Sequence, residues 1–313
     1  MADIYDVAII GGGPAGLTAG IYCSRARLKT VLLEKTMCGG QTLLTDIVEN
    51  FPGFPAGIKG GELADHFTKQ AEHFGLKTVI GEAGRITKTE GAFEITSEGA
   101  GVIKALSVII STGARWNALG IPGEKELTGR GVSYCATCDG PLCKKKDVVV
   151  VGGGDSAIED ALFLAKFADS VTVIHRRDRL RAAQILQERA FADKKIKFKF
   201  NSTAVGIMGT SKVEGVKIKD VISGAEEIVK CGYVFVLIGL TPNSEIVKDM
   251  VQLCEKGYII CDDEMRTSAE GVFAAGDIRR KLLRQVVTAA GDGAVAAASA
   301  RHYVEHLKGT EYK

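Results

Sequence analysis

Short runs of β-branched and aliphatic residues recur along this chain, and glycines follow several of them directly. The run from Val7 to Ile10 leads into Gly11, and the run from Val148 to Val151 leads into Gly152. Unbroken apolar runs of about four to eight residues are typical of parallel strands that are buried on both faces. The pattern therefore predicts an α/β protein.

The two runs belong to an internal repeat, because VAIIGGGPAG at position 7 matches VVVVGGGDSA at position 148, an offset of 141 residues. In each copy a helical stretch (17–26 and 158–167) and a second strand (30–33 and 170–174) follow the glycines. Strand, glycine turn, helix and strand form the unit that binds dinucleotides, in which the pyrophosphate meets the start of the helix. Glycine turns also occur for packing reasons, but two copies favour binding. The candidate cofactor residues are Gly11, Gly13, Pro14, Ala15 and Gly16 in the first copy, and Gly152, Gly154, Asp155, Ser156 and Ala157 in the second.

The two copies differ at the position that selects the nucleotide. Glu34 ends the second strand of the first copy, where an acid holds ribose hydroxyls, although it could be an ordinary surface acid. The same offset carries Glu34 onto His175, which opens the basic cluster HRRDRLR. Guanidinium groups bind a 2′-phosphate that a carboxylate would repel, so the second copy should prefer NADPH, unless the cluster is a solvated turn.

Two further apolar runs lead into a glycine, Gly113 within 108–113 and Gly239 within 234–242, and each run is expected to return to the sheet of its own nucleotide unit. The alternating stretch 194–200 predicts a half-exposed strand with Ile196, Phe198 and Phe200 facing inward. The segment 271–278 lacks a third glycine turn and is expected to complete the first domain.

Composition narrows the class of protein. The chain has 313 residues, which suggests about two domains. With 40 basic and 38 acidic residues, it carries no field that would attract nucleic acid or an anionic membrane. Eight cysteines are too few for a secreted disulfide scaffold, and no apolar run is long enough to span a membrane. We expect a cytoplasmic protein.

Cys135 and Cys138 form a C-x-x-C pair between the two nucleotide units. Such a pair is either a redox disulfide or half of a metal site, and a metal site would need further ligands at suitable spacing. Cys143 is nearby, but the local sequence offers no fourth ligand, so we expect no metal. A flavin between a nicotinamide and a disulfide can pass on two electrons, which predicts FAD in the first copy.

Taken together and in this order, the motifs of the chain are specific to one family. They are GGGPAG, GGQ, ENFPGFP, CATCDG, GGGDSA, HRRDRLR and FAAGD followed by RQ. From Val7 to its C-terminus the chain resembles the bacterial low-molecular-weight NADPH-dependent thioredoxin reductases. The resemblance implies two Rossmann-like domains, with an NADPH domain (116–244, carrying the C-x-x-C) inserted into an FAD domain (1–115 and 245–313). It also implies a homodimer that passes electrons from NADPH through FAD to the cysteine pair and on to thioredoxin.

The resemblance also assigns residues. It places Gly40, Gln41 and Asn50 near the flavin, completes that site with Asp277, Arg284 and Gln285, and gives the 2′-phosphate to Arg176, Arg177 and Arg181. We expect Gly113 and Gly276, which end apolar segments, to belong to the flavin site, and His175 to belong to the NADPH site. In the resembling family the residue matching Cys138 faces the flavin and the residue matching Cys135 attacks the partner. Asp139 is expected to donate or relay a proton, or else to cap a helix start.

One departure leaves the partner open, because Pro141, Leu142 and Cys143 stand where such reductases can carry aromatic residues. The partner could therefore be another thioredoxin-like or peroxidase-linked disulfide protein. A non-catalytic flavin or nucleotide sensor and a ferredoxin-linked relative are further alternatives. The intact cysteine pair argues against the sensor, and the intact second nucleotide motif argues against the ferredoxin-linked enzyme. Because nicotinamide and the cysteine pair must both reach the flavin, the inserted domain should rotate between half-reactions, with hinges near 113–119 and 239–243.

Overall fold

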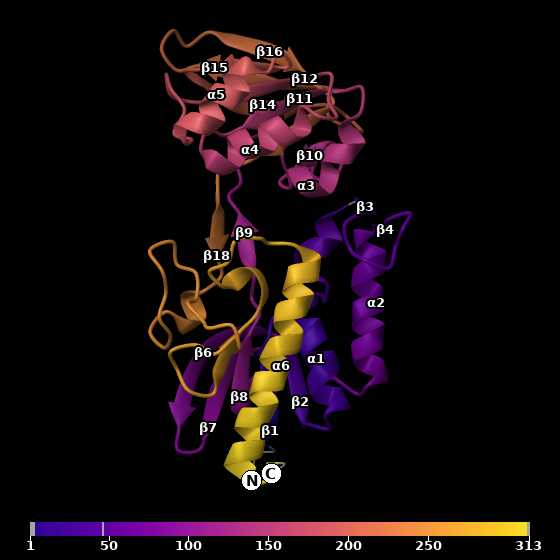
Figure 1. Ribbon diagram of the computed structural model, residues 1–313, viewed down its shortest axis with the longest axis vertical. Coiled ribbons are helices and arrows are strands. Elements are labelled where there is room, and N and C mark those ends of the chain that lie inside the picture. The colour runs from indigo at the N-terminus through magenta and orange to yellow at the C-terminus, as the bar shows by residue number, and fades with distance from the viewer. Residues whose placement is uncertain (1–3, 46, 312–313) are drawn as a thin grey trace. The chain divides into compact units, whose positions relative to one another are not determined.

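The computed structural model describes residues 4–45 and 47–311, and the chain divides into two compact units. The described residues of the first unit are 4–43, 48–115 and 241–311, and those of the second are 44, 45, 47 and 116–240. Both ends of the chain therefore build the first unit, while its middle builds the second (Figure 1). The predicted α/β class with one nucleotide-type unit inserted into another is confirmed.

The sheet of the first unit has seven strands within the described residues, in the order β5-β2-β1-β8-β7-β6, with β19 also beside β8. Its strands are β1 (Tyr5–Ile10), β2 (Thr30–Glu34), β5 (Lys77–Ile80), β6 (Glu82–Thr89), β7 (Ala92–Glu98), β8 (Gly101–Ile110) and β19 (Val272–Ala274). The pairs β1–β2, β1–β8, β2–β5 and β8–β19 are parallel, and β6–β7–β8 form an antiparallel meander. Short strands β3 (Ile47–Val48) and β4 (Ile58–Lys59) lie outside this sheet.

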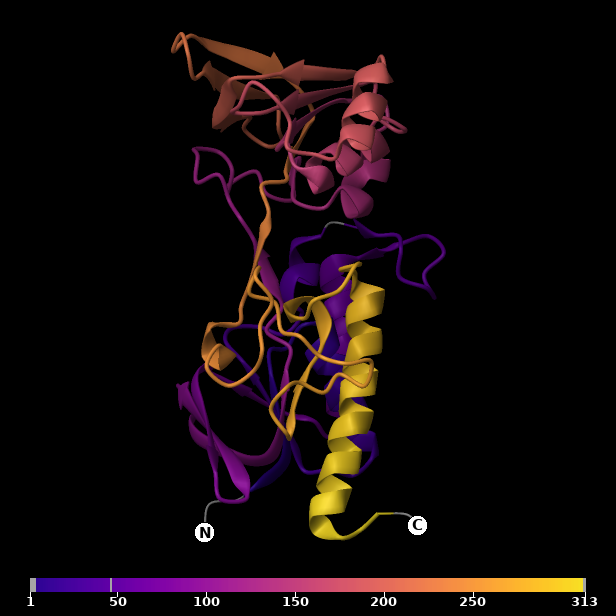
Figure 2. The same cartoon turned by 60° about the vertical axis from the view of Figure 1, so that its left-hand side comes forward.

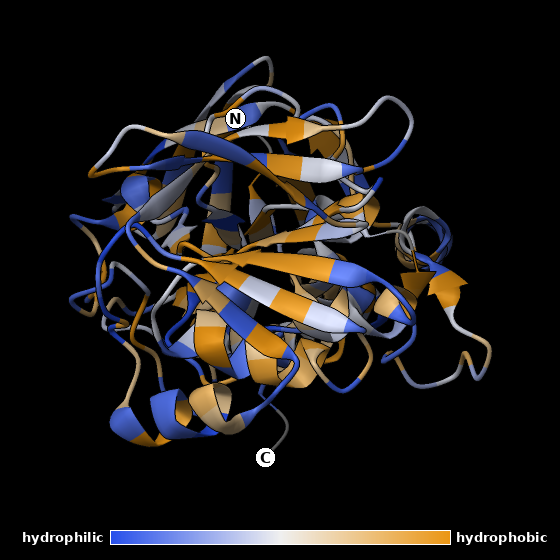
Figure 3. Cartoon of the chain, turned by 90° about the horizontal axis from the view of Figure 1, so that it is seen from above, coloured by the Kyte–Doolittle hydropathy of each residue, from blue (hydrophilic) through white to orange (hydrophobic). Residues whose placement is uncertain are grey.

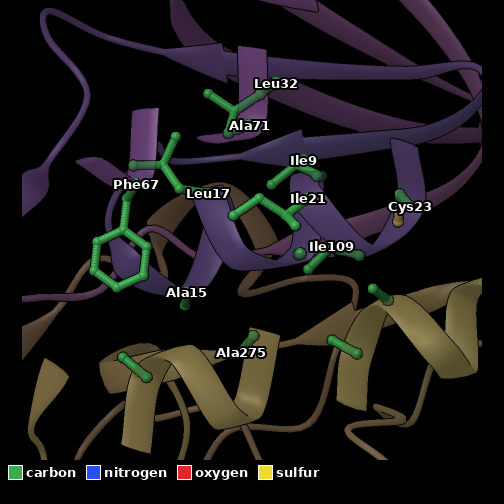
Figure 4. Close-up of a cluster of buried hydrophobic side chains, with 14 of the residues drawn as sticks. Ile9, Ala15, Leu17, Ile21, Cys23, Leu32, Phe67, Ala71, Ile109 and Ala275 are labelled. Atoms are coloured by element: carbon green, nitrogen blue, oxygen red, sulfur yellow. The ribbon is translucent and has the colours of Figure 1, made fainter. Parts of the chain in front are cut away.

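Helices α1 (Pro14–Arg25), α2 (Gly60–His73) and α6 (Val286–Lys308) belong to this unit, with the 3₁₀ helices η3 (Glu245–Val247) and η4 (Gly276–Ile278). The 3₁₀ helix η1 (Gly40–Leu44) also belongs to it, except for its last residue. Helix α6 runs along the unit as one long element, yellow in Figure 2. It packs closely on α1, because a Cβ added at Gly293 would lie 2.1 Å from the carbonyl oxygen of Ala15. Figure 4 shows the apolar cluster around this contact, with Ile9, Ala15, Leu17, Ile21, Leu32, Ile109 and Ala275.

The second unit holds a parallel sheet in the order β10-β17-β11-β12-β13, which has five strands in the described residues. Its elements are β10 (Val132–Ser133), α3 (Ala136–Asp139), η2 (Gly140–Cys143), β11 (Asp147–Val151), α4 (Asp155–Leu164), β12 (Ser170–Ile174), α5 (Gln184–Ala192), β13 (Ile196–Lys199) and β17 (Tyr233–Val236). An antiparallel sheet of β14 (Ser202–Met208), β15 (Gly215–Asp220) and β16 (Glu226–Lys230) completes the unit. Figure 3 shows hydrophobic and hydrophilic residues alternating along strands, as half-exposed sheets require.

The chain passes between the two units along β9 (Ala114–Trp116) and β18 (Leu240–Pro242), which pair with each other. The N–H of Asn243 donates to the carbonyl of Gly113 at 3.0 Å within the first unit. Within the second unit the N–H of Asn117 donates to the carbonyl of Gly239 at the same distance. The chain returns to the first unit at residue 241, four residues before the expected boundary after 244.

Candidate active site

Cys135 and Cys138 form a disulfide in the second unit, with their Cα atoms 5.3 Å apart. Cys135 is the extended residue that precedes helix α3, and its Sγ accepts a hydrogen bond from the N–H of Cys138 at 3.3 Å. The hydroxyl of Ser133 accepts from the Cys135 N–H at 3.1 Å and donates to the Cys135 carbonyl at 3.3 Å. Both cysteines are half-buried. The redox interpretation of the C-x-x-C is therefore the one that the structure adopts.

Asp139 is the last residue of α3 and lies directly before η2. Its side chain makes no capping hydrogen bond to η2, and α3 is capped by Cys135 instead. The carboxyl group is half-buried within four residues of both redox cysteines. Asp139 thus holds the position before η2 without a side-chain cap bond, and its proton role stays a prediction.

The neighbouring thiol of Cys143 is fully buried and donates a hydrogen bond to the carbonyl of Asp139 at 3.6 Å. Burial raises its pKa to about 12, and the charge of Asp139 acts in the same direction. Cys38, which lies beside Gly12, is half-buried, and burial with the charge of Glu34 raises its pKa to about 11. Neither thiol forms a reactive thiolate at neutral pH.

The first glycine turn joins β1 to α1, and its glycines have different physical roles. Gly11 has φ +104, and a Cβ there would lie 2.5 Å from the Ser111 carbonyl oxygen. A Cβ at Gly16 would lie 1.9 Å from the Gly11 carbonyl oxygen, so these two glycines permit the turn and the packing of α1. Gly13 precedes α1 without a side-chain cap, and a Cβ there would meet no atom closer than 4.0 Å. The space in front of α1 is therefore open to an anion.

Glu34 lies where the sequence predicted, at the end of β2 beside this turn. One carboxylate oxygen accepts a hydrogen bond from the N–H of Gly12 at 2.7 Å, and the other accepts from the N–H of Thr36 at 3.1 Å. These bonds fix the carboxylate next to the open space at Gly13. Pro14 and Ala15 form the first residues of α1.

Of the remaining predicted flavin residues of the first unit, Asn50 and Gln285 contact each other, whereas Gln41 bonds to a residue that was not predicted. The side-chain amide of Gln41 donates to the Ala114 carbonyl, and the amide of Asn50 donates to Oε1 of Gln285 at 3.0 Å. Gln285 precedes helix α6 and forms a capping box with Thr288. Gly40 and Gly113 both have positive φ, and a Cβ at Gly113 would meet no atom within 4 Å.

Asp277 lies in η4, directly after Gly276, and its Oδ1 is buried without a hydrogen-bond partner. Burial raises the pKa of this carboxyl group, while Lys281 and Arg284 oppose the shift. Arg284 donates to the carbonyl of Asp277 at 3.4 Å, and its guanidinium lies 4.1 Å from the ring centre of Tyr258. A buried carboxyl oxygen without a partner calls for a donor from a ligand, such as a sugar hydroxyl.

The second glycine turn joins β11 to α4 in the same way. A Cβ at Gly152 would lie 2.6 Å from the Leu237 carbonyl oxygen, whereas a Cβ at Gly154 would meet no atom within 4 Å. Gly154 precedes α4 without a side-chain cap, so the space in front of this helix is also open. Asp155, expected to contact the cofactor, accepts a hydrogen bond from the N–H of Ala183 at 2.7 Å. Ser156 is exposed, and Ala157 is buried in the packing of α4.

The predicted basic cluster follows β12 and lies beside this turn, because the N–H of Arg181 donates to the carbonyl of Gly153 at 2.7 Å. Arg176, Arg177 and Arg181 are exposed, and no ion pair engages them within residues 4–45 and 47–311. His175 is buried, and its Nε2 has no hydrogen-bond partner. Burial lowers the pKa of His175; a bond to the Arg179 main chain opposes this, and the three arginines add to the lowering. The guanidinium groups of the cluster are therefore available to pair with an anion.

Comparison with known proteins identifies the family of this chain. The family model described as pyridine nucleotide-disulphide oxidoreductase matches residues 5–293. The chain belongs to this family. It is 47% identical over 306 residues to the thioredoxin reductase of Listeria monocytogenes, covering 97% of this chain and 95% of that one. It is 48% identical over 308 residues to the thioredoxin reductase of Bacillus subtilis, covering 98% and 97%.

Solved structures in the family agree. The thioredoxin reductase of Streptococcus pyogenes is 44% identical and superposes with a TM-score of 0.92, covering 97% of this chain and 99% of that one. The thioredoxin reductase of Lactococcus lactis, in a structure called the FR conformation, is also 44% identical, with a TM-score of 0.67 and 96% and 99% coverage. The resemblance seen in the sequence motifs is thus confirmed.

Sequence reasoning missed two buried carboxylates in this member of the oxidoreductase family. Asp292 on α6 supports the segment that carries Asp277, and Glu124 binds the segment that carries Cys135. A single charged residue within the alanine-rich stretch 286–300 was the available signal for Asp292. The described residues contain no helix able to cross a membrane and no group of three metal-ligating side chains.

Proposed function

We propose that the protein is an NADPH-dependent thioredoxin-disulfide reductase that uses FAD and the Cys135–Cys138 disulfide. The observation that carries the proposal is the closed disulfide, which lies in the same unit as one of two glycine turns. In the overall reaction NADPH and one proton reduce a disulfide to two thiols. The names of the relatives support thioredoxin as the disulfide partner.

The residues of the first unit fit FAD. The open space at Gly13 in front of α1 suits a pyrophosphate, and the fixed carboxylate of Glu34 suits ribose hydroxyls. The unpartnered Oδ1 of Asp277 suits a further hydroxyl donor. When bound, FAD would supply a two-electron carrier between a nicotinamide and a disulfide.

The residues of the second unit fit NADPH. Gly154 leaves the start of α4 open to a pyrophosphate, and Arg176, Arg177 and Arg181 offer guanidinium groups to a 2′-phosphate. Since burial lowers the pKa of His175, its neutral ring can bond a ribose or phosphate oxygen through the free Nε2.

The thiols would then act in sequence. Once the Cys135–Cys138 bond is reduced, the thiolate of Cys135 attacks a disulfide sulfur of the partner, and the other partner sulfur leaves as a thiol. Cys138 attacks the resulting mixed disulfide, which releases the reduced partner and restores the internal disulfide. Asp139, the residue directly after Cys138, would supply or accept the protons that these steps require.

We further propose that the inserted unit rotates between the two half-reactions, using β9 and β18 as hinges. Gly113 and Gly239, which flank these strands, have positive φ. The two solved relatives with equal identity superpose on this chain with TM-scores of 0.92 and 0.67, which supports more than one whole-chain conformation in the family. We also propose a homodimer in the cytoplasm, as the resemblance implies.

The deciding experiment is NADPH-driven reduction of a panel of purified thioredoxins, other thioredoxin-like proteins and peroxidase-linked disulfide proteins. We expect reduction of a thioredoxin by the wild-type protein. Cys138→Ser should abolish disulfide reduction while NADPH still bleaches the flavin. Reduction confined to peroxidase-linked proteins would favour that alternative partner, and NADPH-driven disulfide reduction that survives Cys138→Ser would overturn the assignment.

A further inference from the structure

Glu124 is a buried carboxylate without an ion pair in the described part of the chain. Its side chain belongs to a residue that is 3% exposed. Three hydrogen bonds satisfy it: Oε1 accepts from the N–H of Leu119 at 2.9 Å, and Oε2 accepts from the N–H of Gly120 at 2.8 Å. The third comes from the hydroxyl of Tyr134, which donates to Oε1 at 2.9 Å. A buried charge is tolerated when its acceptor positions are filled in this way.

The aromatic ring of Tyr134 provides a second link to the same region. It stacks on Trp116 of β9, with ring centres 5.3 Å apart and an interplanar angle of 17°. Burial, together with the hydrogen bond and charge of Glu124, raises the pKa of Tyr134 to about 12. The hydroxyl therefore remains a hydrogen-bond donor throughout the physiological pH range. Tyr134 is held at its ring by Trp116 and at its hydroxyl by Glu124.

Tyr134 is the residue that directly precedes Cys135. On its other side, Ser133 is buried and makes two hydrogen bonds to the main chain of Cys135. The segment that carries the attacking cysteine is thus held at Ser133 and at Tyr134. The second anchor leads through Glu124 to the loop at Leu119 and Gly120, and through Trp116 to a connecting strand.

We propose that Glu124 and Tyr134 are positioning residues that hold Cys135 in the geometry of the disulfide. The inference deepens the proposed function, on which it rests for the meaning of the redox pair. A link that restrains Cys135 when the thiols are free raises their effective concentration toward each other, because less conformational entropy is lost when the disulfide closes. The link therefore favours the oxidised form.

The test is the equilibrium between the protein disulfide and a glutathione redox buffer, in which two glutathione thiols become one glutathione disulfide as the protein pair is reduced. Tyr134→Phe removes the hydroxyl but keeps the ring that stacks on Trp116. Glu124→Gln keeps the shape of the side chain. We expect each variant to lower the equilibrium constant for protein disulfide formation at least threefold, a rise of about 14 mV in reduction potential.

A matched control is Ser202→Ala, which removes another buried hydroxyl of the second unit that donates to the Phe200 carbonyl at 2.8 Å. It should leave the redox equilibrium unchanged. The double variant of Glu124 and Tyr134 should match the larger single effect, because Glu124 is linked to the Cys135 segment through the hydrogen bond that it accepts from the Tyr134 hydroxyl. If Glu124→Gln does not fold, Tyr134→Phe alone decides.

Wild-type equilibrium constants in all folded variants, or equal shifts in Ser202→Ala, would overturn the inference. The measurement needs neither NADPH nor thioredoxin, and the redox state of Cys135 and Cys138 is followed by alkylation and mass spectrometry. A failure of the proposed function would therefore appear in the panel assay while this equilibrium still reported on the link.

Discussion

Asp292 of helix α6 accepts a hydrogen bond from the main-chain N–H of Gly276 at 3.0 Å, across 16 residues of sequence. The same carboxylate forms ion pairs with Arg279 at 3.0 Å and Lys281 at 2.6 Å, and all three side chains are at most 13% exposed. The carboxylate thus pairs with two buried cations and fixes the turn that carries Asp277. Removing one member of such a buried group leaves uncompensated charge.

We predict that Asp292→Ala lowers the free energy of unfolding by about 3–5 kcal/mol, because Arg279 and Lys281 lose their anion and Gly276 loses its acceptor. FAD should also dissociate more readily, which flavin fluorescence released on dilution would measure. Asp65→Asn, which breaks an exposed ion pair with Lys69, is the control and should leave the denaturation midpoint unchanged. A wild-type midpoint for Asp292→Ala would contradict the role given to Asp292.

Asp160 on α4 should make stability fall as the pH rises. Burial, with a contribution from Glu159, raises its pKa from 3.8 to about 6. Well below pH 3.8 the group is protonated in both the folded and the unfolded chain, whereas above pH 6 the folded chain must hold an unfavourable charge. Asp160→Asn should therefore gain about 1–3 kcal/mol over wild type between pH 4 and pH 7 in denaturant titrations. Glu188→Gln, at an exposed site on α5, should follow the wild-type curve, and a constant difference for Asp160→Asn would refute the shift.

Three buried thiols should not react with alkylating reagents in the folded protein. Burial raises the pKa of Cys23, Cys143 and Cys231 to about 12, so at pH 8 only about one molecule in ten thousand carries the thiolate. Mass-spectrometric mapping after treatment with iodoacetamide should show labelling of Cys135 in reduced protein, and labelling of the buried three after unfolding. Cys143→Ser should retain disulfide reduction. Labelling of Cys143 as fast as Cys135 would disprove its isolation.

The coenzyme preference should depend on the free arginines. Replacing Arg176 and Arg177 by Gln should raise KM for NADPH roughly ten- to a hundredfold, because charged hydrogen bonds to the 2′-phosphate are lost. KM for NADH should change little. Arg189→Gln, at an exposed position on α5, serves as the control. Equal use of both coenzymes by the wild-type protein would exclude a phosphate site here.

Alanine substitutions at Gly152 and Gly154 should affect different properties, protein stability at Gly152 and NADPH binding at Gly154. Gly154→Ala adds a methyl group into open space and should cost no more than about 1 kcal/mol at this helix start, yet weaken NADPH binding by about tenfold or more because it fills the approach to α4. Gly152→Ala places its Cβ against the Leu237 carbonyl and should lower the melting temperature. Calorimetry of binding and of unfolding on both variants makes the comparison. Unchanged NADPH affinity in Gly154→Ala would place the pyrophosphate elsewhere.

The sequence predicted the parallel strands well, because strands buried on both faces are continuous apolar runs. The strand expected at 170–174 is β12 with the same bounds, whereas the helices expected at 17–26 and 158–167 begin three residues earlier, at Pro14 and Asp155. In these two helices the glycine turn itself sets the start. In the strand expected at 194–200, Ile196 is buried, while Phe198 and Phe200 are half-buried against the core.

Tertiary hydrogen bonds could not be predicted in the same way. The sequence of a glycine turn determines its local backbone geometry. By contrast, Asp292 contacts Gly276 and Glu124 contacts Tyr134 only after separate segments of the chain have packed together. A recognised motif does not fix every contact either. Asp155 lies inside the second glycine motif and was expected to contact the cofactor, but its carboxylate accepts a hydrogen bond from the N–H of Ala183. The antiparallel strands β14–β16 were not predicted, because their mixed polar pattern carries no motif.

The packing of Gly293 against Ala15 has a consequence for biosynthesis. A ribosome releases β1 and α1 early, but α6, which packs on α1, follows about 260 residues later, and β19 follows its partner β8 after about 160 residues. The inserted unit, by contrast, has nearly all of its strands and helices between residues 116 and 240 and can close while translation continues. During translation the second unit can therefore be folded while the first unit is still incomplete. The apolar faces of β1 and α1 need protection from aggregation until α6 emerges.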